Sequence, residues 1–223
     1  MEILLTIGGK EILIHDTIVN LWLVVIGLCI FSVVVNKKIE KAKVDETPSS
    51  FLNVIEILVE SINSLLVSTM GAKNMKFAPY IFTLMCFLGV SNLLGLIGLT
   101  PPTSDYSVTF SLALITFTLT QIMAIKTQKG LGGYLKSFTE PMAFLTPLNV
   151  IGELANPISL SFRLFGNVMS GGIIMTLLYN ALGYFAPLVT PFLHGYFDVF
   201  SGLLQTFIFG MLTMIFIGGA TEE

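Results

Sequence analysis

Residues 156–172, NPISLSFRLFGNVMSGG, hold the feature that decides how this chain is organised. Arg163 stands in the middle of this mainly apolar stretch and is the only arginine among the 223 residues. A guanidinium group does not lose its proton in a protein, so the chain places a permanent charge in an apolar helix at a cost of at least about 2.5–3.5 kcal/mol. We interpret Arg163 as an ion-path residue that faces a carboxylate on another element. The alternative is a structural ion pair, or a side chain that reaches back to the lipid headgroups.

Helical spacing groups small and polar residues around this charge, because residues three and four positions apart share one face of a helix. The stripe around the arginine consists of Ser159, Arg163, Asn167 and Ser170 or Gly171, with Gly166 beside it. A second stripe with the same spacing consists of Gly195, Asp198, Ser201 or Gly202, and Gln205. Small residues let helices approach closely in a membrane. The two stripes therefore predict one shared interior between consecutive antiparallel helices.

The composition places the chain in a membrane. Hydrophobic residues make up 54% of the sequence and charged residues 11%, and the mean hydropathy is +0.86, which is typical of membrane proteins. The 11 basic and 14 acidic residues exclude a nucleic-acid binder that uses a basic patch, and also a disordered acidic tail. Cys29 and Cys86 lie in apolar runs without metal-ligand spacing, so we predict no disulfide, metal site or cofactor. The N-terminal residues lack the pattern of a removable signal.

The predicted fold is an all-α membrane protein with a single domain, residues 1–223. A membrane span needs about 20 mostly apolar residues. After an external N-terminal segment at 1–16, the predicted spans are 17–36, 77–99, 107–125, 144–182 and 190–220. One further helix is predicted at 49–70, where Glu56 and Glu60 give it a polar face. We expect this amphipathic helix to lie along the membrane surface.

The last two spans are predicted to form a long tilted hairpin. Residues 145–181 number 37 and would extend about 55 Å as a continuous helix. The hydrocarbon core of a bilayer is only about 30 Å thick. A helix of this length must tilt steeply, bend, or partly leave the membrane.

The lysines predict the orientation. They gather in the connectors after the first span, before the second and after the third, at Lys37, Lys38, Lys41, Lys43, Lys73, Lys76, Lys126, Lys129 and Lys136. Cytoplasmic loops carry an excess of lysine and arginine, so these connectors are predicted to face the cytoplasm. The N-terminus then lies outside and the C-terminus inside, in a multi-pass membrane protein.

Three segments carry a resemblance to a known family. LSFRLFGN at 160–167, PLNVIGELANP at 147–157 and LLQTFIFGMLTMIF at 203–216 closely resemble the a subunit of F-type ATP synthase of bacterial type. The resemblance implies a membrane stator with two half-channels that couple proton or sodium flow to rotation of a ring of c subunits. It also implies that this chain has no catalytic site or cofactor of its own. The implied partners are the c ring, the b-subunit stator stalk, the remaining synthase subunits and membrane lipid, without nucleic acid.

The resemblance also implies roles for individual residues. Arg163 matches the essential arginine that faces the ion-binding carboxylates of passing c subunits. Asn167 and Gln205 match polar positions that line the ion path. Asp198 falls where relatives carry a titratable residue of the outer half-channel, and Glu153 is a candidate for the inner half-channel. Nine residues after Arg163, where many relatives carry a titratable group, this sequence has glycine, which leaves Asp198 as the main outer acid and the ion's identity open.

Structural interpretations of the same residues stand beside these. Asp198 would neutralise Arg163, Gln205 would bond to a backbone carbonyl, and Glu153 would cap the inner surface. His194 is interpreted as an interfacial residue rather than a relay. Two other functions remain as alternatives: a secondary transporter whose arginine binds an anionic substrate, and an assembly scaffold. A transporter would usually have a repeated half, which this sequence lacks.

Overall fold

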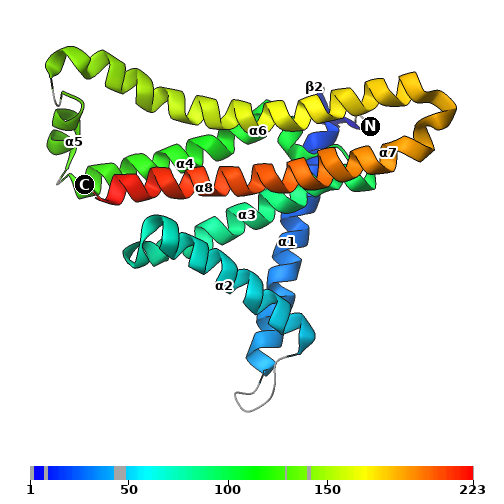
Figure 1. Ribbon diagram of the computed structural model, residues 1–223, viewed down its shortest axis with the longest axis horizontal. Helices are drawn as coiled ribbons and strands as arrows, with labels where there is room; N and C mark the ends of the chain where they lie inside the picture. The colour runs from blue at the N-terminus through cyan, green and yellow to red at the C-terminus, as the bar shows by residue number, and fades with distance from the viewer. Residues whose placement is uncertain (1–2, 8–9, 43–48, 129, 140–141, 223) are drawn as a thin grey trace.

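The computed structural model describes residues 3–7, 10–42, 49–128, 130–139 and 142–222. Lys43 and Lys129, which contributed to the predicted orientation, lie outside the described residues. The described chain is almost entirely helical (Figure 1), which confirms the predicted class of all-α membrane protein. One antiparallel hairpin, β1 (Ile3–Ile7) paired with β2 (Lys10–Ile14), precedes the helices and was not predicted.

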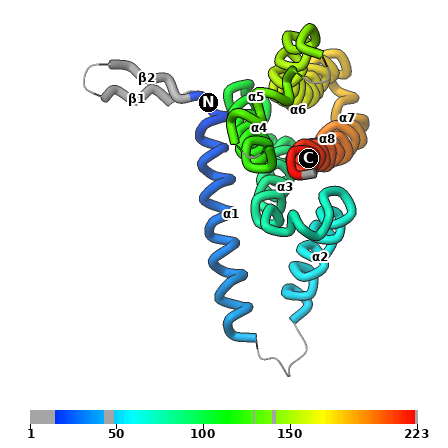
Figure 2. Tube along the Cα trace, turned by 90° about the vertical axis from the view of Figure 1, so that its left-hand side faces the viewer, coloured from blue at the N-terminus to red at the C-terminus, as the bar shows by residue number. Residues whose placement is uncertain are grey.

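Helix α1 (Asp16–Lys41) stands crosswise to α4, α6 and α8 (Figures 1 and 2). It extends beyond the predicted span at 17–36 because lysine and glutamate favour a helix as much as apolar residues do. Asn36 Nδ2 donates a hydrogen bond of 2.8 Å to Glu40 Oε1 in this extension. Hydropathy had marked where the apolar surface ends rather than where the helix ends.

Helix α2 (Ser50–Met70) begins after Ser49, whose side chain accepts a hydrogen bond from the backbone of Leu52. A 3-10 segment, η1 (Ala72–Phe77), leads into α3 (Ala78–Leu93), and the 3-10 turn η2 (Leu94–Ile97) follows. Helices α2, α3 and α8 meet in an apolar cluster of buried residues that consists of Leu66, Met70, Ile81, Met214 and Ile217. This cluster holds α2 against the body of the protein.

Five described stretches are long and apolar enough to cross a membrane. They are Asp16–Lys41, Ser50–Met70, Ala72–Ile97, Tyr106–Thr127 and Ala143–Thr221. The last stretch has 79 residues and contains both arms of the predicted hairpin. Length and composition place α2 among the candidate spans, so its position on the membrane surface stays a prediction.

Between α3 and α6 the chain forms one long helix, α4, and several short helical segments. The 3-10 turn η3 (Pro102–Ser104) precedes α4 (Tyr106–Thr127). The segment predicted as a plain basic linker holds α5 (Leu131–Ser137), and the 3-10 turn η4 (Ala143–Leu145) leads into α6. Asp105 caps α4, because its Oδ1 accepts a hydrogen bond of 2.8 Å from the backbone of Ser107.

The hairpin has two unequal arms. Helix α6 (Thr146–Leu182) has 37 residues and is continuous through Pro157. The return arm differs from the predicted span at 190–220. It consists of η5 (Gly183–Phe185), α7 (Ala186–His194), the π-helical segment η6 (Gly195–Phe200) and α8 (Ser201–Glu222). It starts earlier because Pro187 occupies the first turn of α7, where a missing N–H costs nothing.

The hydrophobic core sits where α3, α4, α6 and α8 meet. Its buried residues are Leu84, Leu88, Ala113, Leu160, Leu164 and Phe209. Leu160 and Leu164 thus anchor α6 through one face, on which Ser161 is also buried, whereas Arg163 is exposed on another face. The hairpin lies crosswise to α1 (Figure 1), an arrangement that fits the predicted steep tilt.

Candidate functional site

The side chain of Arg163 is exposed, although its neighbour Leu164 is fully buried. Among the described residues it has no hydrogen bond or ion pair. The interpretation of Asp198 as a structural partner of Arg163 is therefore not what the structure shows, because Asp198 contacts His194 instead. Helix α6 presents its permanent charge on a face that the described part of the chain leaves uncovered.

The two polar stripes meet in part. Asn167 Nδ2 donates a hydrogen bond of 2.7 Å to Gln205 Oε1 across the hairpin, and one cavity is lined by Asn167 and Gly171 of the first stripe and by Asp198, Ser201, Gly202 and Gln205 of the second. Gln205 is buried, whereas Asn167, Ser159 and Ser170 are exposed beside the arginine. The predicted shared interior is therefore present at the Asp198 end of the hairpin, whereas Ser159 and Arg163 lie outside it on an exposed face. Gln205 bonds to a side chain here, rather than to a backbone carbonyl.

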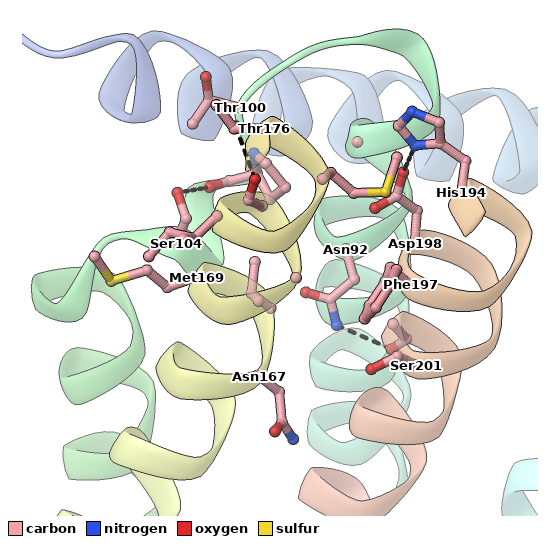
Figure 3. A pocket seen from close by; sticks show the side chains of 18 of the residues that line it. Asn92, Thr100, Ser104, Asn167, Met169, Thr176, His194, Phe197, Asp198 and Ser201 are labelled. Carbon is pink, nitrogen blue, oxygen red and sulfur yellow. Dashed lines mark hydrogen bonds and ion pairs between the residues drawn. The ribbon is translucent and has the colours of Figure 1, made fainter. Parts of the chain in front are cut away.

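A cavity of about 660 Å³ lies at the end of the hairpin that contains Asp198 (Figure 3). We call it the Asp198 cavity. Its polar lining residues are Asn92, Thr100, Ser104, Asn167, Thr176, His194, Asp198, Ser201 and Gln205. Three parts of the chain form it: α6, the return arm, and the loop that follows α3. Asp198 itself lies in η6. π-Helical turns are rare in proteins, and those that occur are often found at functional sites.

Asp198 is closely surrounded. Its Oδ2 is in hydrogen-bonding contact with His194 Nδ1, and Tyr179 Oη lies 2.7 Å from His194 Nε2. On the opposite side, a Cβ atom added to Gly95 would lie 3.0 Å from the Asp198 carboxyl carbon. A residue larger than glycine at position 95 would therefore displace the carboxyl group by a few tenths of an ångström. The interpretation of His194 as an interfacial residue missed its contact with Asp198.

Asn92 joins α3 to the return arm next to the same cavity. Its Nδ2 donates to Gly202 O at 3.1 Å and to Thr206 Oγ1 at 3.2 Å, and its Oδ1 accepts from Thr103 Oγ1 at 2.7 Å. The sequence analysis did not single out Asn92. The available signal was a polar side chain inside an apolar span, where burial requires hydrogen-bond partners.

Gln205 has one unsatisfied group. It is 2% exposed, and its Nε2 has no hydrogen-bond partner among the described residues. A buried amide donor without a partner costs about 1–3 kcal/mol. Because Gln205 lines the Asp198 cavity, this donor is suited to bind water or an arriving ligand there.

A second cavity of about 660 Å³ lies at the other end of the hairpin. We call it the Glu153 cavity. Glu153 Oε2 accepts a hydrogen bond of 3.0 Å from Gln121 Nε2, and Tyr134 Oη donates to Gln121 Oε1. Burial raises the pKa of Tyr134, and the negative charge of Glu153 raises it further. Gln121 and Tyr134 were missed because the contact joins α4, α5 and α6, which no sequence spacing connects.

Arg163 lies between the two cavities along α6. The Glu153 cavity reaches Asn156 on this helix, and the Asp198 cavity begins at Asn167. The intervening stretch covers about 17 Å at 1.5 Å per residue. Arg163 lines neither cavity in the described part of the chain. No group of three or more potential metal ligands occurs among the described residues.

These features define a class: a multi-pass α-helical membrane protein with a polar cavity at each end of its long hairpin and an uncovered arginine between them. The family described as "ATP synthase A chain" matches residues 18–218. The chain belongs to this family. It is a membrane-sector subunit that acts within the ATP synthase complex, in ATP synthesis and ion transport.

Curated relatives agree with this assignment. The chain is 37% identical over 213 residues to "ATP synthase subunit a" of Geobacter sp. (strain M21), which covers 93% of this chain and 88% of the relative. The protein of the same name from Geobacter sulfurreducens is 37% identical with the same coverage. That from Mycoplasma pneumoniae is 36% identical over 233 residues, which covers 92% of this chain and 79% of the relative. The resemblance inferred from three sequence segments is confirmed.

Proposed function

We propose that this subunit conducts the coupling ion through two half-channels. The Asp198 cavity opens to the outside and the Glu153 cavity opens to the cytoplasm. Between them, Arg163 faces the carboxylates of a rotating ring of c subunits. The observation that carries the proposal is an uncovered, unpaired arginine placed between two polar cavities on one hairpin.

The electrostatics of Arg163 supply the mechanism. An ion entering through the Asp198 cavity neutralises a carboxylate of the ring, which then travels through lipid. A positive charge within about 4–6 Å favours the ionised form of a carboxyl group, so the ring releases its ion when the carboxylate meets Arg163. The fixed cation also blocks direct passage between the cavities. The membrane potential contributes about 2.3 kcal/mol per charge per 100 mV.

The remaining residues have supporting roles. Asp198 is the acid of the outer half-channel, and Glu153 that of the inner one. The hydrogen bond between Asn167 and Gln205 holds the two arms together at the inner end of the Asp198 cavity. The N-terminus lies outside and the C-terminus in the cytoplasm of a plasma-membrane protein. The b-subunit stalk fixes this chain against the rotating ring, and ATP chemistry takes place on other subunits.

A secondary transporter would require its arginine to line a substrate cavity within this chain. Arg163 lines neither of the two large cavities and is exposed on the outer face of α6. An arginine in this position is suited to a partner in the membrane rather than to a soluble anion. The rotary function is therefore favoured over transport.

The test is Arg163→Ala in the assembled synthase, reconstituted in lipid vesicles. We expect ion-driven ATP synthesis to fall at least about 100-fold, the scale for loss of a preorganised charge, with assembly intact. Arg163→Lys should also fail, because an ammonium loses its proton more readily and lacks the planar fork. Ser159→Ala, one turn away on the same exposed face, is the matched control and should synthesise ATP normally. Normal ion-driven synthesis by an assembled Arg163→Ala enzyme would refute the proposal.

A further inference from the structure

We infer that His194, held between Tyr179 and Asp198, is a second proton-accepting residue of the Asp198 cavity and passes protons to Asp198. This inference rests on the proposed function, and it assigns a role to a histidine outside the residues given to the ion path so far. It also makes the proton the ion that enters through this cavity.

The geometry supports a relay. His194 Nε2 lies 2.7 Å from Tyr179 Oη, and His194 Nδ1 contacts Asp198 Oδ2. Both ring nitrogens are therefore engaged, Nε2 by a tyrosine near the surface and Nδ1 by the acid of the cavity; Figure 3 shows the second contact. Sodium and other hard cations prefer oxygen ligands, whereas an imidazole nitrogen accepts and donates protons.

Exposure falls in steps along this chain of groups. Tyr179 is 45% exposed, the side chain of His194 28%, that of Asp198 20%, and Gln205 2%. The contacts from Tyr179 to His194 and from His194 to Asp198 thus lead from the surface into the cavity, whose lining also includes the buried amide of Gln205. His194 stands where a proton collected at the rim would pass to the acid.

Other titratable groups near the pair are few. In the described lining of the cavity, His194 and Asp198 are the titratable side chains. Helix α6 presents Tyr179 to the imidazole, while η2 presents Gly95 to the carboxyl group. Helix α3 contributes the amide of Asn92, and α8 contributes Ser201 and Gln205. Arg163 is about 24 Å from Tyr179 along α6 at 1.5 Å per residue.

The transfer step balances in protons. One proton binds to His194 Nε2, either from a hydronium ion of the outside water, which becomes water, or from Tyr179 Oη, which a hydronium ion then reprotonates. The proton on Nδ1 moves at the same time to Asp198 Oδ2. The imidazole keeps its charge and changes its tautomer, and Asp198 becomes neutral. After Asp198 passes its proton inward, the starting tautomer of His194 is restored, either by rotation of the imidazole ring about its side-chain bond or by proton exchange with water.

The test measures ATP synthesis by the complete synthase in vesicles whose lumen faces the Asp198 cavity, at a constant membrane potential and varied lumenal pH. We expect His194→Gln to reduce the rate about tenfold at lumenal pH 8, less than the roughly 100-fold typical for loss of a proton-transfer group, because Asp198 still accepts protons from water. At pH 5 the rate should stay within about twofold of the unmodified enzyme, because abundant protons reach Asp198 directly through water. Tyr179→Phe should act in the same direction but less, since water still reaches Nε2.

Matched controls separate this role from a general structural effect. His15→Gln removes the other histidine, and Tyr196→Phe removes a hydroxyl group on the return arm outside the cavity lining. Both should leave the pH profile unchanged. If His194 acts in series with Asp198, the double variant His194→Gln/Asp198→Asn should be no slower than Asp198→Asn alone.

Two results would overturn the inference. The first is a pH profile for assembled His194→Gln that superimposes on that of the unmodified enzyme. The second is a rate that rises with lumenal sodium at fixed pH. In either case an inactive Arg163→Ala variant leaves the proposed function standing, so the two failures are distinguishable.

Discussion

The two cavities have the same volume but hold their acids in different ways. In the Asp198 cavity the carboxyl group contacts an imidazole, and its other side lies so close to Gly95 that an added Cβ atom would be 3.0 Å from the carboxyl carbon. In the Glu153 cavity the carboxyl group is bound by a neutral amide, which a phenol orients in turn. One acid therefore has a partner that exchanges protons, and the other has partners that do not.

The surroundings of the cavities differ as well. Besides the hairpin, the Asp198 cavity is lined by the loop after α3, which contains η2 and η3. The Glu153 cavity is bordered by α4 and by the connector helix α5. At each end of the hairpin, residues from elements outside the hairpin thus complete the lining of the cavity. Apart from the hairpin, the two cavities are lined by different elements and should respond independently to mutation.

The largest effect that distinguishes the cavities is expected from Asp198→Asn. This change keeps the shape but removes the titratable group of the outer path. Ion-driven ATP synthesis should fall at least about 30-fold, somewhat below the roughly 100-fold lower end of the range for a proton-transfer residue. The loss should depend steeply on the external ion concentration, measured in a series of pH and sodium, with assembly followed in parallel. A rate within about twofold of the unmodified enzyme, with normal assembly, would remove Asp198 from the path.

A smaller loss is expected from Gly95→Ala. The added Cβ atom would lie 3.0 Å from the carboxyl carbon of Asp198, so the acid must move without any change in its own chemistry. Misplacement of a reacting group by about 1 Å costs up to about 100-fold, and a partial shift should slow synthesis about tenfold. Gly89→Ala is the control, because its Cβ would meet Thr206 at an ordinary 3.9 Å. Equal rates for the two variants would contradict the close packing of Asp198.

Glu153→Gln should cost less than the changes at the outer cavity. Its cavity has other polar lining groups, including Asn156, which keep the path hydrated. We expect a loss of about fivefold, below the usual range for a lone proton-transfer group. It should depend on the pH of the cytoplasmic side, measured as ATP-driven ion pumping. A loss that depends on external pH instead would place Glu153 in a path open to the outside and contradict its assignment to the cytoplasmic cavity.

The smallest effect is expected from Tyr134→Phe. The raised pKa keeps the phenol protonated to a higher pH than that of a free tyrosine, so its hydrogen bond to Gln121 persists across the physiological range. Loss of one such bond is worth about 0.5–1.5 kcal/mol, and we expect pumping to fall about twofold. The cytoplasmic pH profile should shift while the external profile stays fixed. A shift in the external profile would mean that the cavities are coupled.

The sequence predicted the helical body of this protein better than its turns. Apolar runs located the helices because burial in lipid demands them. The π-helical segment around Asp198 left no such mark, because hydropathy does not distinguish a π-helical turn from an α-helical one. The stripe that contains Asp198 and Gln205 lies on one continuous arm, although Asp198 belongs to η6 and Gln205 to α8. The neighbours Asn92 and Gly95 of this stripe, and the partner Gln121 of Glu153, come from elements distant in sequence, and only the folded structure brings them together.

The most direct test of the two half-channels uses a matched pair of glycines on α6. Gly172 lines the Asp198 cavity and Gly152 lines the Glu153 cavity, and a Cβ at either position meets nothing within 4 Å. Each is replaced by cysteine in a chain without Cys29 and Cys86, and a small membrane-impermeant thiol reagent is applied from either side. The account predicts that Gly172→Cys reacts only from outside and Gly152→Cys only from the cytoplasm. Reaction of both cysteines from the same side would contradict it.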